Sequence, residues 1–172
     1  MNLCGYYPES INEGEGLRAA VFISGCRHRC RGCFSPATWN FSYGEPFTLD
    51  RQDEIIRDIA GNPLLSGISL LGGDPFFSAD EVSGFLDRLY EQAGPVNVWA
   101  YTGYTFEELT ADPASAEYGL LRRCHVLVDG RFEEKLRDPS LRYCGSSNQR
   151  LIDIPASLAG GQVILWKPAL TF

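Results

Sequence analysis

Three of the six cysteines in this chain lie close together, and their spacing is its strongest chemical signal. Cys26, Cys30 and Cys33 form a Cys-x₃-Cys-x₂-Cys segment, whereas the other three cysteines are scattered. Cysteine thiolates hold iron–sulfur clusters, and a complete [4Fe–4S] cube normally takes four of them. Three thiolates on one short loop leave one iron without a local protein ligand. Because a catalytic metal site needs such an open position, the spacing favours an enzyme over an electron carrier.

A structural zinc site is the alternative that the spacing alone leaves open. Zinc in structural sites takes four ligands. The fourth would be His28, or one of Cys4, Cys124 and Cys144 brought in by the fold. A disulfide framework is disfavoured, because clustered cysteines in a cytosolic protein are typical of metal-binding or catalytic sites.

The hydrophobic pattern predicts that strands and helices alternate along the chain. Such alternation builds a parallel sheet from right-handed strand–helix–strand units. A chain of 172 residues is too short for a complete eight-unit barrel of about 250 residues. We therefore predict an α/β fold in which a single domain over residues 1–172 forms an incomplete, open β/α barrel. The expected strands are 18–24, 67–71, 96–102, 125–128, 150–154 and 162–166, and the expected helices are 50–60 with Asp50 as cap, 78–93 with a Ser78–Glu81 capping box, a short helix opening with a Thr105–Glu108 capping box, and 116–123.

Four segments with distinctive residues follow predicted strands. They are the cysteine loop, Gly72–Pro75, Thr102-Gly103 and Asp129-Gly130. Ligands collect at the carboxyl ends of parallel strands, so we expect these segments to share one rim. The simpler alternative is that Gly72–Pro75 and Asp129-Gly130 are plain turns, for which their residue types are also suited.

Composition and charge narrow the class of protein. The net charge of −7 argues against a general nucleic-acid binder, which needs a basic surface. No apolar run approaches the roughly 18 residues that span a bilayer. The N-terminal residues have neither the basic region nor the apolar region of a signal peptide. We therefore expect a cytoplasmic protein with no nucleic-acid partner and no membrane partner.

Short motifs between residues 6 and 149 occur in an order that is typical of one family. Cys-x₃-Cys-x₂-Cys after a first strand is the signature of the radical S-adenosylmethionine superfamily. Within it, the chain resembles the family that activates anaerobic ribonucleoside-triphosphate reductase, a glycyl radical enzyme. The last twenty or so residues carry no motif of that family. The segments that carry the resemblance are Tyr6–Pro8, Ser24–Cys26, Gly32-Cys33, Gly72–Pro75, Thr102–Tyr104, Val126–Gly130, Asp138–Leu141 and Gly145–Gln149.

The resemblance implies an open barrel of radical S-adenosylmethionine type with two cofactors. The three clustered cysteines would ligate a [4Fe–4S] cluster, and the amino and carboxylate groups of S-adenosylmethionine would chelate the open iron. Gly72, Gly73, Asp74 and Pro75 match the family's motif that receives the methionyl amino group. Glycine lets the backbone approach a ligand closely, and a carboxylate accepts a charge-assisted hydrogen bond from an ammonium group.

Further positions match the family with two departures. Gly32 and Phe34, around the third cysteine, would lie along the adenine, although many relatives have an aromatic residue where this chain has Gly32. Leu71 stands where relatives often carry a small hydroxyl residue, which removes one hydrogen bond. Thr102 and Asp129 resemble positions that help to place the carboxylate or ribose of the cofactor, sometimes through a monovalent cation.

The implied activity is reductive cleavage of S-adenosylmethionine to a 5′-deoxyadenosyl radical, which generates a glycyl radical on the anaerobic ribonucleotide reductase. The substrate is then another protein, and no catalytic side chain is needed beyond the cluster and S-adenosylmethionine. Arg27, Arg29 and Arg31 either form a solvated loop or guide a flavodoxin-like electron donor. Two alternatives remain: an activase of a pyruvate formate-lyase type enzyme, and a non-enzymatic iron–sulfur or zinc protein.

Overall fold

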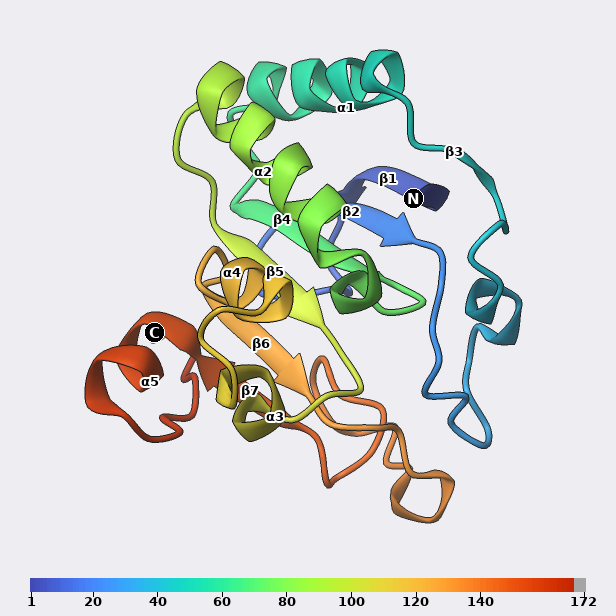
Figure 1. Ribbon diagram of the computed structural model, residues 1–172, viewed down its shortest axis with the longest axis vertical. Coiled ribbons are helices and arrows are strands. Elements are labelled where there is room, and N and C mark those ends of the chain that lie inside the picture. Colours follow the sequence, from blue (N-terminus) through green and yellow to red (C-terminus); the bar gives the residue numbers. More distant parts are fainter. Residues whose placement is uncertain (169–172) are drawn as a thin grey trace.

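The computed structural model describes residues 1–168 as one β-sheet with helices packed against it (Figure 1). Within these residues the sheet has seven strands in the order β3-β1-β2-β4-β5-β6-β7. It is not closed, because β3 and β7 form its two edges. The predicted α/β class and open sheet are confirmed. The predicted single domain also includes residues 169–172, which lie outside the described part of the chain.

The four central strands are parallel and the flanking ones are antiparallel. Strands β2, β4, β5 and β6 pair in parallel, so their carboxyl ends meet at one end of the sheet. Most residues of these four strands are buried, which is typical of parallel strands covered on both faces. The bounds are β1 Asn2–Ser10, β2 Arg18–Ile23, β3 Glu45–Pro46, β4 Gly67–Gly72, β5 Val98–Tyr101, β6 Val126–Asp129 and β7 Arg150–Asp153.

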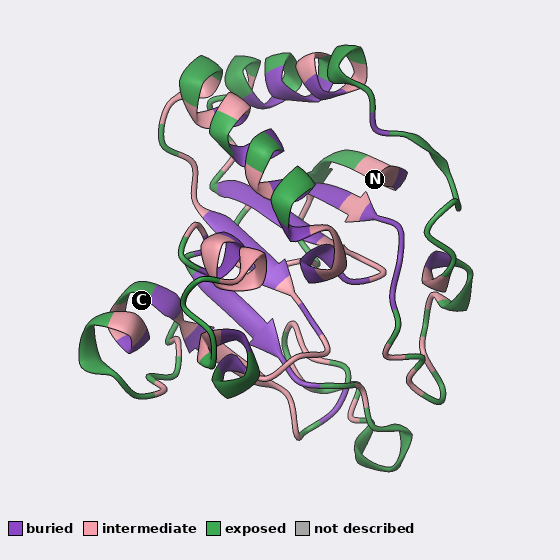
Figure 2. Ribbon diagram, in the orientation of Figure 1, coloured by how far each residue is buried: buried purple, intermediate pink, exposed green. Residues whose placement is uncertain are grey.

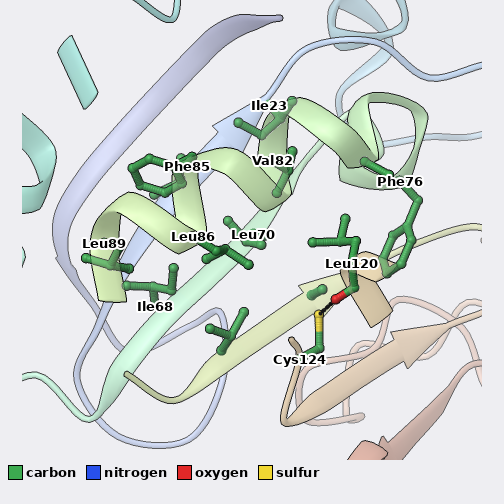
Figure 3. Close-up of a cluster of buried hydrophobic side chains, with 14 of the residues drawn as sticks. Ile23, Ile68, Leu70, Phe76, Val82, Phe85, Leu86, Leu89, Leu120 and Cys124 are labelled. Carbon is green, nitrogen blue, oxygen red and sulfur yellow. Dashed lines mark hydrogen bonds between the residues drawn. The ribbon is translucent and has the colours of Figure 1, made fainter. Parts of the chain in front are cut away.

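Three helices cover one face of the sheet with apolar stripes. They are α1 (Leu49–Gly61), α2 (Ala79–Ala93) and α4 (Ala116–Leu121). Figure 2 shows that their exposed residues face away from the strands, whose own residues are largely buried. Figure 3 shows the α2 stripe lying over β4. The residues packed there include Ile68, Leu70, Val82, Phe85, Leu86 and Leu89, each at most 1% exposed.

The second face of the sheet carries a smaller aromatic cluster and a buried arginine. Trp99 packs against Tyr143 and Trp166, with ring centroids 5.2 and 4.9 Å apart. Arg18 lies beside this cluster with its guanidinium carbon 5.3 Å from the Trp99 ring centroid. Its Nε donates to the hydroxyl of Ser69 at 2.9 Å. Successive side chains of the strands therefore pack on opposite faces of the sheet, as the period of two in a strand requires.

Several of the remaining elements were not predicted. Helix α3 (Phe106–Thr110) begins with the expected capping box of Thr105 and Glu108. Strands β1 and β3 and helix α5 (Ile154–Gly160) had no clear sequence signal. The strand expected at 162–166 is wrong, since only one isolated bridge, from Leu165 to Ile152, forms there. No helix of the described chain is long and apolar enough to cross a membrane.

Two predicted helix caps are wrong for identifiable reasons. Thr48, not Asp50, caps α1 by accepting a hydrogen bond from the amide of Arg51 at 3.3 Å. The hydroxyl of Ser78 makes no capping bond, because the chain enters α2 through the 3₁₀ turn η2 (Pro75–Ser78). That turn is capped by Asp74, which accepts from the amide of Phe76.

Candidate active site

A cavity of about 250 Å³ lies at the carboxyl ends of the parallel strands. The cysteine loop approaches it from β2, and the segments after β4, β5 and β6 complete its wall. In Figure 1 the blue loop after β2 and the orange loop after β6 extend from this same end of the sheet. These segments thus share one rim, as the parallel strands require. Wall residues from the predicted site are Cys26, Cys30, Cys33, Phe34, Gly72, Gly73 and Thr102.

The cysteine loop is held against the glycine motif by backbone hydrogen bonds. The amide of Gly73 donates to the carbonyl of Ile23 at 2.7 Å, and that of Asp74 donates to the carbonyl of Gly25 at 2.9 Å. A Cβ added to Gly73 would lie 2.5 Å from the Gly25 oxygen, and Gly72 has a φ of +112°. Only glycine tolerates these conditions. The motif therefore has a structural task besides any contact with a ligand.

All three clustered cysteines line this cavity. Burial raises the pKa of Cys26 and of Cys30 above its ordinary value, so in the metal-free protein these thiols keep their protons. Iron binding would displace these protons, because the thiolate is the ligand. In residues 1–168, no group of three cysteine, histidine or acidic residues is arranged to hold a single metal ion. Three thiols along one wall fit a cluster in which each ligates its own iron.

The other cysteines lie elsewhere. Cys124 is buried below α4 and its thiol donates to the carbonyl of Leu120 at 3.4 Å (Figure 3). Burial raises its pKa to about 12. Cys4 donates to the carbonyl of Phe22 at 3.3 Å, and Cys144 packs with the aromatic cluster of the second face. None of these three cysteines lines the cavity, so none supplies a fourth ligand there.

Asp74 is buried beside the cavity, and its carboxylate is occupied by the protein. Oδ2 accepts hydrogen bonds from Nε2 of His28 at 3.0 Å, from the hydroxyl of Thr102 at 2.9 Å and from the amide of Gly103 at 2.9 Å. Oδ1 accepts from the amide of Phe76 at 3.0 Å. Asp74 is 1% exposed. This carboxylate joins loops together, and neither it nor Pro75 lines the cavity.

Asp129 is also buried and paired within the protein. Its carboxylate faces Arg150, with Nε 3.0 Å from Oδ1, and Oδ2 accepts from the amide of Phe106 at 2.8 Å. Arg150 extends to Glu107, with Nη1 3.1 Å from Oε1. Because the guanidinium group already neutralises Asp129, this carboxylate does not fit a monovalent cation. Asp129 does not line the cavity of the cysteines, which Gly130 lines instead.

The two positions expected beside the adenine are both exposed, and of the two only Phe34 lines the cavity. Gly32 has a φ of +75°, which explains glycine at this point of the loop. Phe34 lies at the cavity mouth and is 99% exposed. Its ring is thus free to contact a bound molecule or a partner.

Several wall residues carried no usable sequence signal. Trp39, Tyr101 and Phe132 line the cavity but lie outside any motif. Gln149 belongs to a segment whose atoms the sequence could not assign. Its Nε2 donates to the carbonyl of Gly130 at 2.9 Å, which holds the 145–149 loop on the rim.

The three arginines of the cysteine loop have different surroundings. The guanidinium carbon of Arg27 lies 5.5 Å from the Phe41 ring centroid, within cation–π range. Arg31 pairs with Glu134 at 3.0 Å. Arg29 is exposed and has a φ of +49°. Arg27 and Arg29 line an open cavity of about 1100 Å³, which Cys26 also lines.

The open α/β sheet and the three-cysteine cavity are consistent with a single-cluster iron–sulfur protein. A family model described as "4Fe-4S single cluster domain" matches residues 12–152. The chain is also similar to curated proteins named anaerobic ribonucleoside-triphosphate reductase-activating protein. It belongs to that family.

Three relatives give the extent of the similarity. The Escherichia coli (strain K12) protein is 40% identical over 152 residues, which cover 87% of this chain and 96% of the relative. The Salmonella typhi protein is 39% identical over 147 residues, covering 84% and 93%. The protein of Enterobacteria phage T4 is 31% identical over 153 residues, covering 88% and 93%. Nearly the whole length of each relative is therefore matched.

Proposed function

We propose that this protein is a radical S-adenosylmethionine enzyme that activates an anaerobic ribonucleoside-triphosphate reductase. The observation that carries the proposal is the single cavity shared by three clustered cysteines and the Gly72-Gly73 backbone. The names of the relatives support the reductase as the target. The open, centrally parallel sheet supports an incomplete barrel of radical S-adenosylmethionine type.

Cys26, Cys30 and Cys33 would hold a [4Fe–4S] cluster with one iron open to the amino and carboxylate groups of S-adenosylmethionine. When both are bound, the cluster and S-adenosylmethionine supply a one-electron cleavage of S-adenosylmethionine to methionine and a 5′-deoxyadenosyl radical. This radical takes a hydrogen atom from a glycine of the reductase. The chain itself binds, orients and shields. No side chain has to act as a general acid or base.

The cofactor contacts are divided between backbone and side chains. Gly72 and Gly73 present backbone to the methionyl end, and Thr102 lies on the same wall. Gly32 and Phe34 are the positions beside the adenine. Asp74 acts indirectly, since its oxygens already accept four hydrogen bonds from the protein. The proposed cofactors do not include a monovalent cation, because Arg150 neutralises Asp129.

The electron donor is proposed to be an acidic protein such as a flavodoxin. Arg27 and Arg29 form a positive rim beside Cys26 in a protein of net charge −7. Positive charge near the cluster would guide an acidic donor to this face. Arg31 contributes less, because Glu134 pairs with it.

The test is anaerobic reconstitution with iron and sulfide, followed by EPR of the dithionite-reduced protein with and without S-adenosylmethionine. The proposal predicts a [4Fe–4S]⁺ signal that changes when S-adenosylmethionine is added, together with 5′-deoxyadenosine. A zinc-only protein, or a cluster whose signal ignores S-adenosylmethionine, would support the structural-metal alternative. A glycyl radical formed on a pyruvate formate-lyase type enzyme, and not on the reductase, would support the other activase.

A further inference from the structure

We propose that His28 is a positioning residue that fixes the cysteine loop to Asp74 and thereby sets the open iron opposite Gly72 and Gly73. This inference rests on the proposed function. It assigns a role to a histidine for which the sequence predicts only a place in the loop or, in the alternative zinc site, the fourth ligand position.

His28 has a buried side chain between two exposed residues of the loop, Arg27 and Arg29. Its side chain is 4% exposed, whereas Arg29 is exposed and the side chain of Arg31 is 93% exposed. The imidazole packs against two aromatic rings, with centroids 5.0 Å from Phe77 and 4.7 Å from Tyr104, and these two rings also contact each other at 5.3 Å. The loop between the first and second cysteines is therefore anchored through this one ring.

The hydrogen bond from His28 to Asp74 joins three loops at a single oxygen atom. Oδ2 of Asp74 accepts from His28 after β2, and from Thr102 and Gly103 after β5. Asp74 itself follows β4. The packing is close, because a Cβ added to Gly103 would overlap the imidazole of His28. A carboxylate fixed by donors on both sides leaves the ring little freedom to shift.

The position of His28 in the sequence links its contact with Asp74 to the placement of the cluster ligands. It lies two residues from both Cys26 and Cys30 and belongs to the wall of the same cavity. The three thiols remain without His28, so a cluster still has its ligands. Its placement against Gly72 and Gly73 would change, and the open iron would meet S-adenosylmethionine less well. Residues that orient metal ligands typically act in this way.

The experiment compares two replacements that separate packing from hydrogen bonding. His28→Phe keeps a ring against Phe77 and Tyr104 but cannot donate to Asp74. His28→Gln loses the ring but can place an amide donor near the position of Nε2. His125→Asn is the matched control, because the second histidine of the chain accepts from the amide of Val98 at 3.1 Å, beyond the cavity wall.

Iron content, the EPR spectrum and midpoint potential of the reduced cluster, and the Kd for S-adenosylmethionine are measured for all three variants. We expect H28F to bind iron as the wild type does, with an altered EPR spectrum and a Kd raised about tenfold. H28Q should recover most of the wild-type affinity, and H125N should leave spectrum and Kd unchanged.

An H28F cluster with the wild-type spectrum, potential and Kd would overturn the proposal. An equal loss of iron in H28F, H28Q and H125N would also overturn it, because the effect would then be on folding alone. A wild-type cluster that ignores S-adenosylmethionine would contradict the proposed function. In that case the spectrum and potential of H28F, measured without S-adenosylmethionine, still decide the role of His28.

Discussion

Arg150, at the start of β7, forms a bidentate ion pair with Asp129, at the end of β6. Its Nε lies 3.0 Å from Oδ1, and its Nη2 faces Oδ2. The same Nη2 also lies 2.7 Å from Oε2 of Glu107 on α3. This one guanidinium group therefore joins an edge strand, a central strand and a helix. It also keeps a buried aspartate neutralised just behind the cavity rim.

Arg150→Met should destabilise the protein by about 3 kcal/mol, because the buried carboxylate of Asp129 loses its counter-charge. Glu107→Gln is the control. Its side chain is largely exposed, so this change should cost less than about 1 kcal/mol. Urea unfolding of the metal-free proteins measures both. An equal loss in the free energy of unfolding in the two variants would show that the pair with Asp129 stabilises the protein no more than the pair with Glu107.

Gly73→Ala should disturb the cysteine loop, because the added methyl group would lie 2.5 Å from the Gly25 carbonyl oxygen. We expect reconstituted iron to fall by at least about half, since metal binding depends on a formed site. Gly84→Ala, inside α2, is the matched control, because nothing lies within 4 Å of its added Cβ. That change should leave iron content intact and stabilise the helix by about 0.5–1 kcal/mol. Full iron loading of G73A would show that the loop adapts without loss of the site.

The stability of the metal-free protein should fall as the pH drops below about 6.5, partly through His125. Burial, together with Arg18, lowers the pKa of His125 below its ordinary value of 6.5, although Asp153 opposes this. The unfolded chain then binds the proton more readily than the folded chain, so acid favours unfolding. The window begins at pH 6.5 and extends down to the lowered pKa. His125→Asn should flatten this part of the profile of unfolding midpoint against pH, and an unchanged slope would exclude His125 as its source.

Replacement of Arg27, Arg29 and Arg31 together by glutamine should slow cluster reduction by an acidic flavodoxin and weaken its dependence on salt. Reduction by dithionite, a small reagent, is the control and should stay unchanged. Stopped-flow absorbance at several ionic strengths gives both rates. If the triple variant and the wild type are reduced by flavodoxin at the same rate, the loop is simply solvated.

The sequence was informative where apolar periodicity or special residue types determine the structure. The stripe of α2 and the buried runs of β4 and β6 identified their elements, with ends misplaced by a residue or two. Antiparallel β1 escaped prediction because four of its nine residues are polar or glycine and its burial is irregular. The cap at Ser78 failed because Pro75 imposes a 3₁₀ turn first, while Glu81 contacts the amino group of Met1.

Site residues were predictable where they belong to a recognisable motif, and their partners outside the motifs were not. The cysteine spacing and the glycine pair indicated segments that share one cavity. The partners of Asp74 and Asp129 were not predictable, because His28 and Arg150 are distant in sequence and meet them only through the fold. Both carboxylates therefore looked available to a ligand in sequence, although the protein itself occupies them.

The most direct test of the central claim is EPR detection of a glycyl radical on the anaerobic ribonucleoside-triphosphate reductase. The reductase is incubated anaerobically with reconstituted protein, S-adenosylmethionine and a reductant, beside a Cys30→Ala variant and a Cys124→Ala variant. We predict a glycyl radical with the wild type and with C124A, none with C30A, and about one 5′-deoxyadenosine formed for each radical. A radical of undiminished yield with C30A, or none with a fully loaded wild-type protein that cleaves S-adenosylmethionine, would contradict this account.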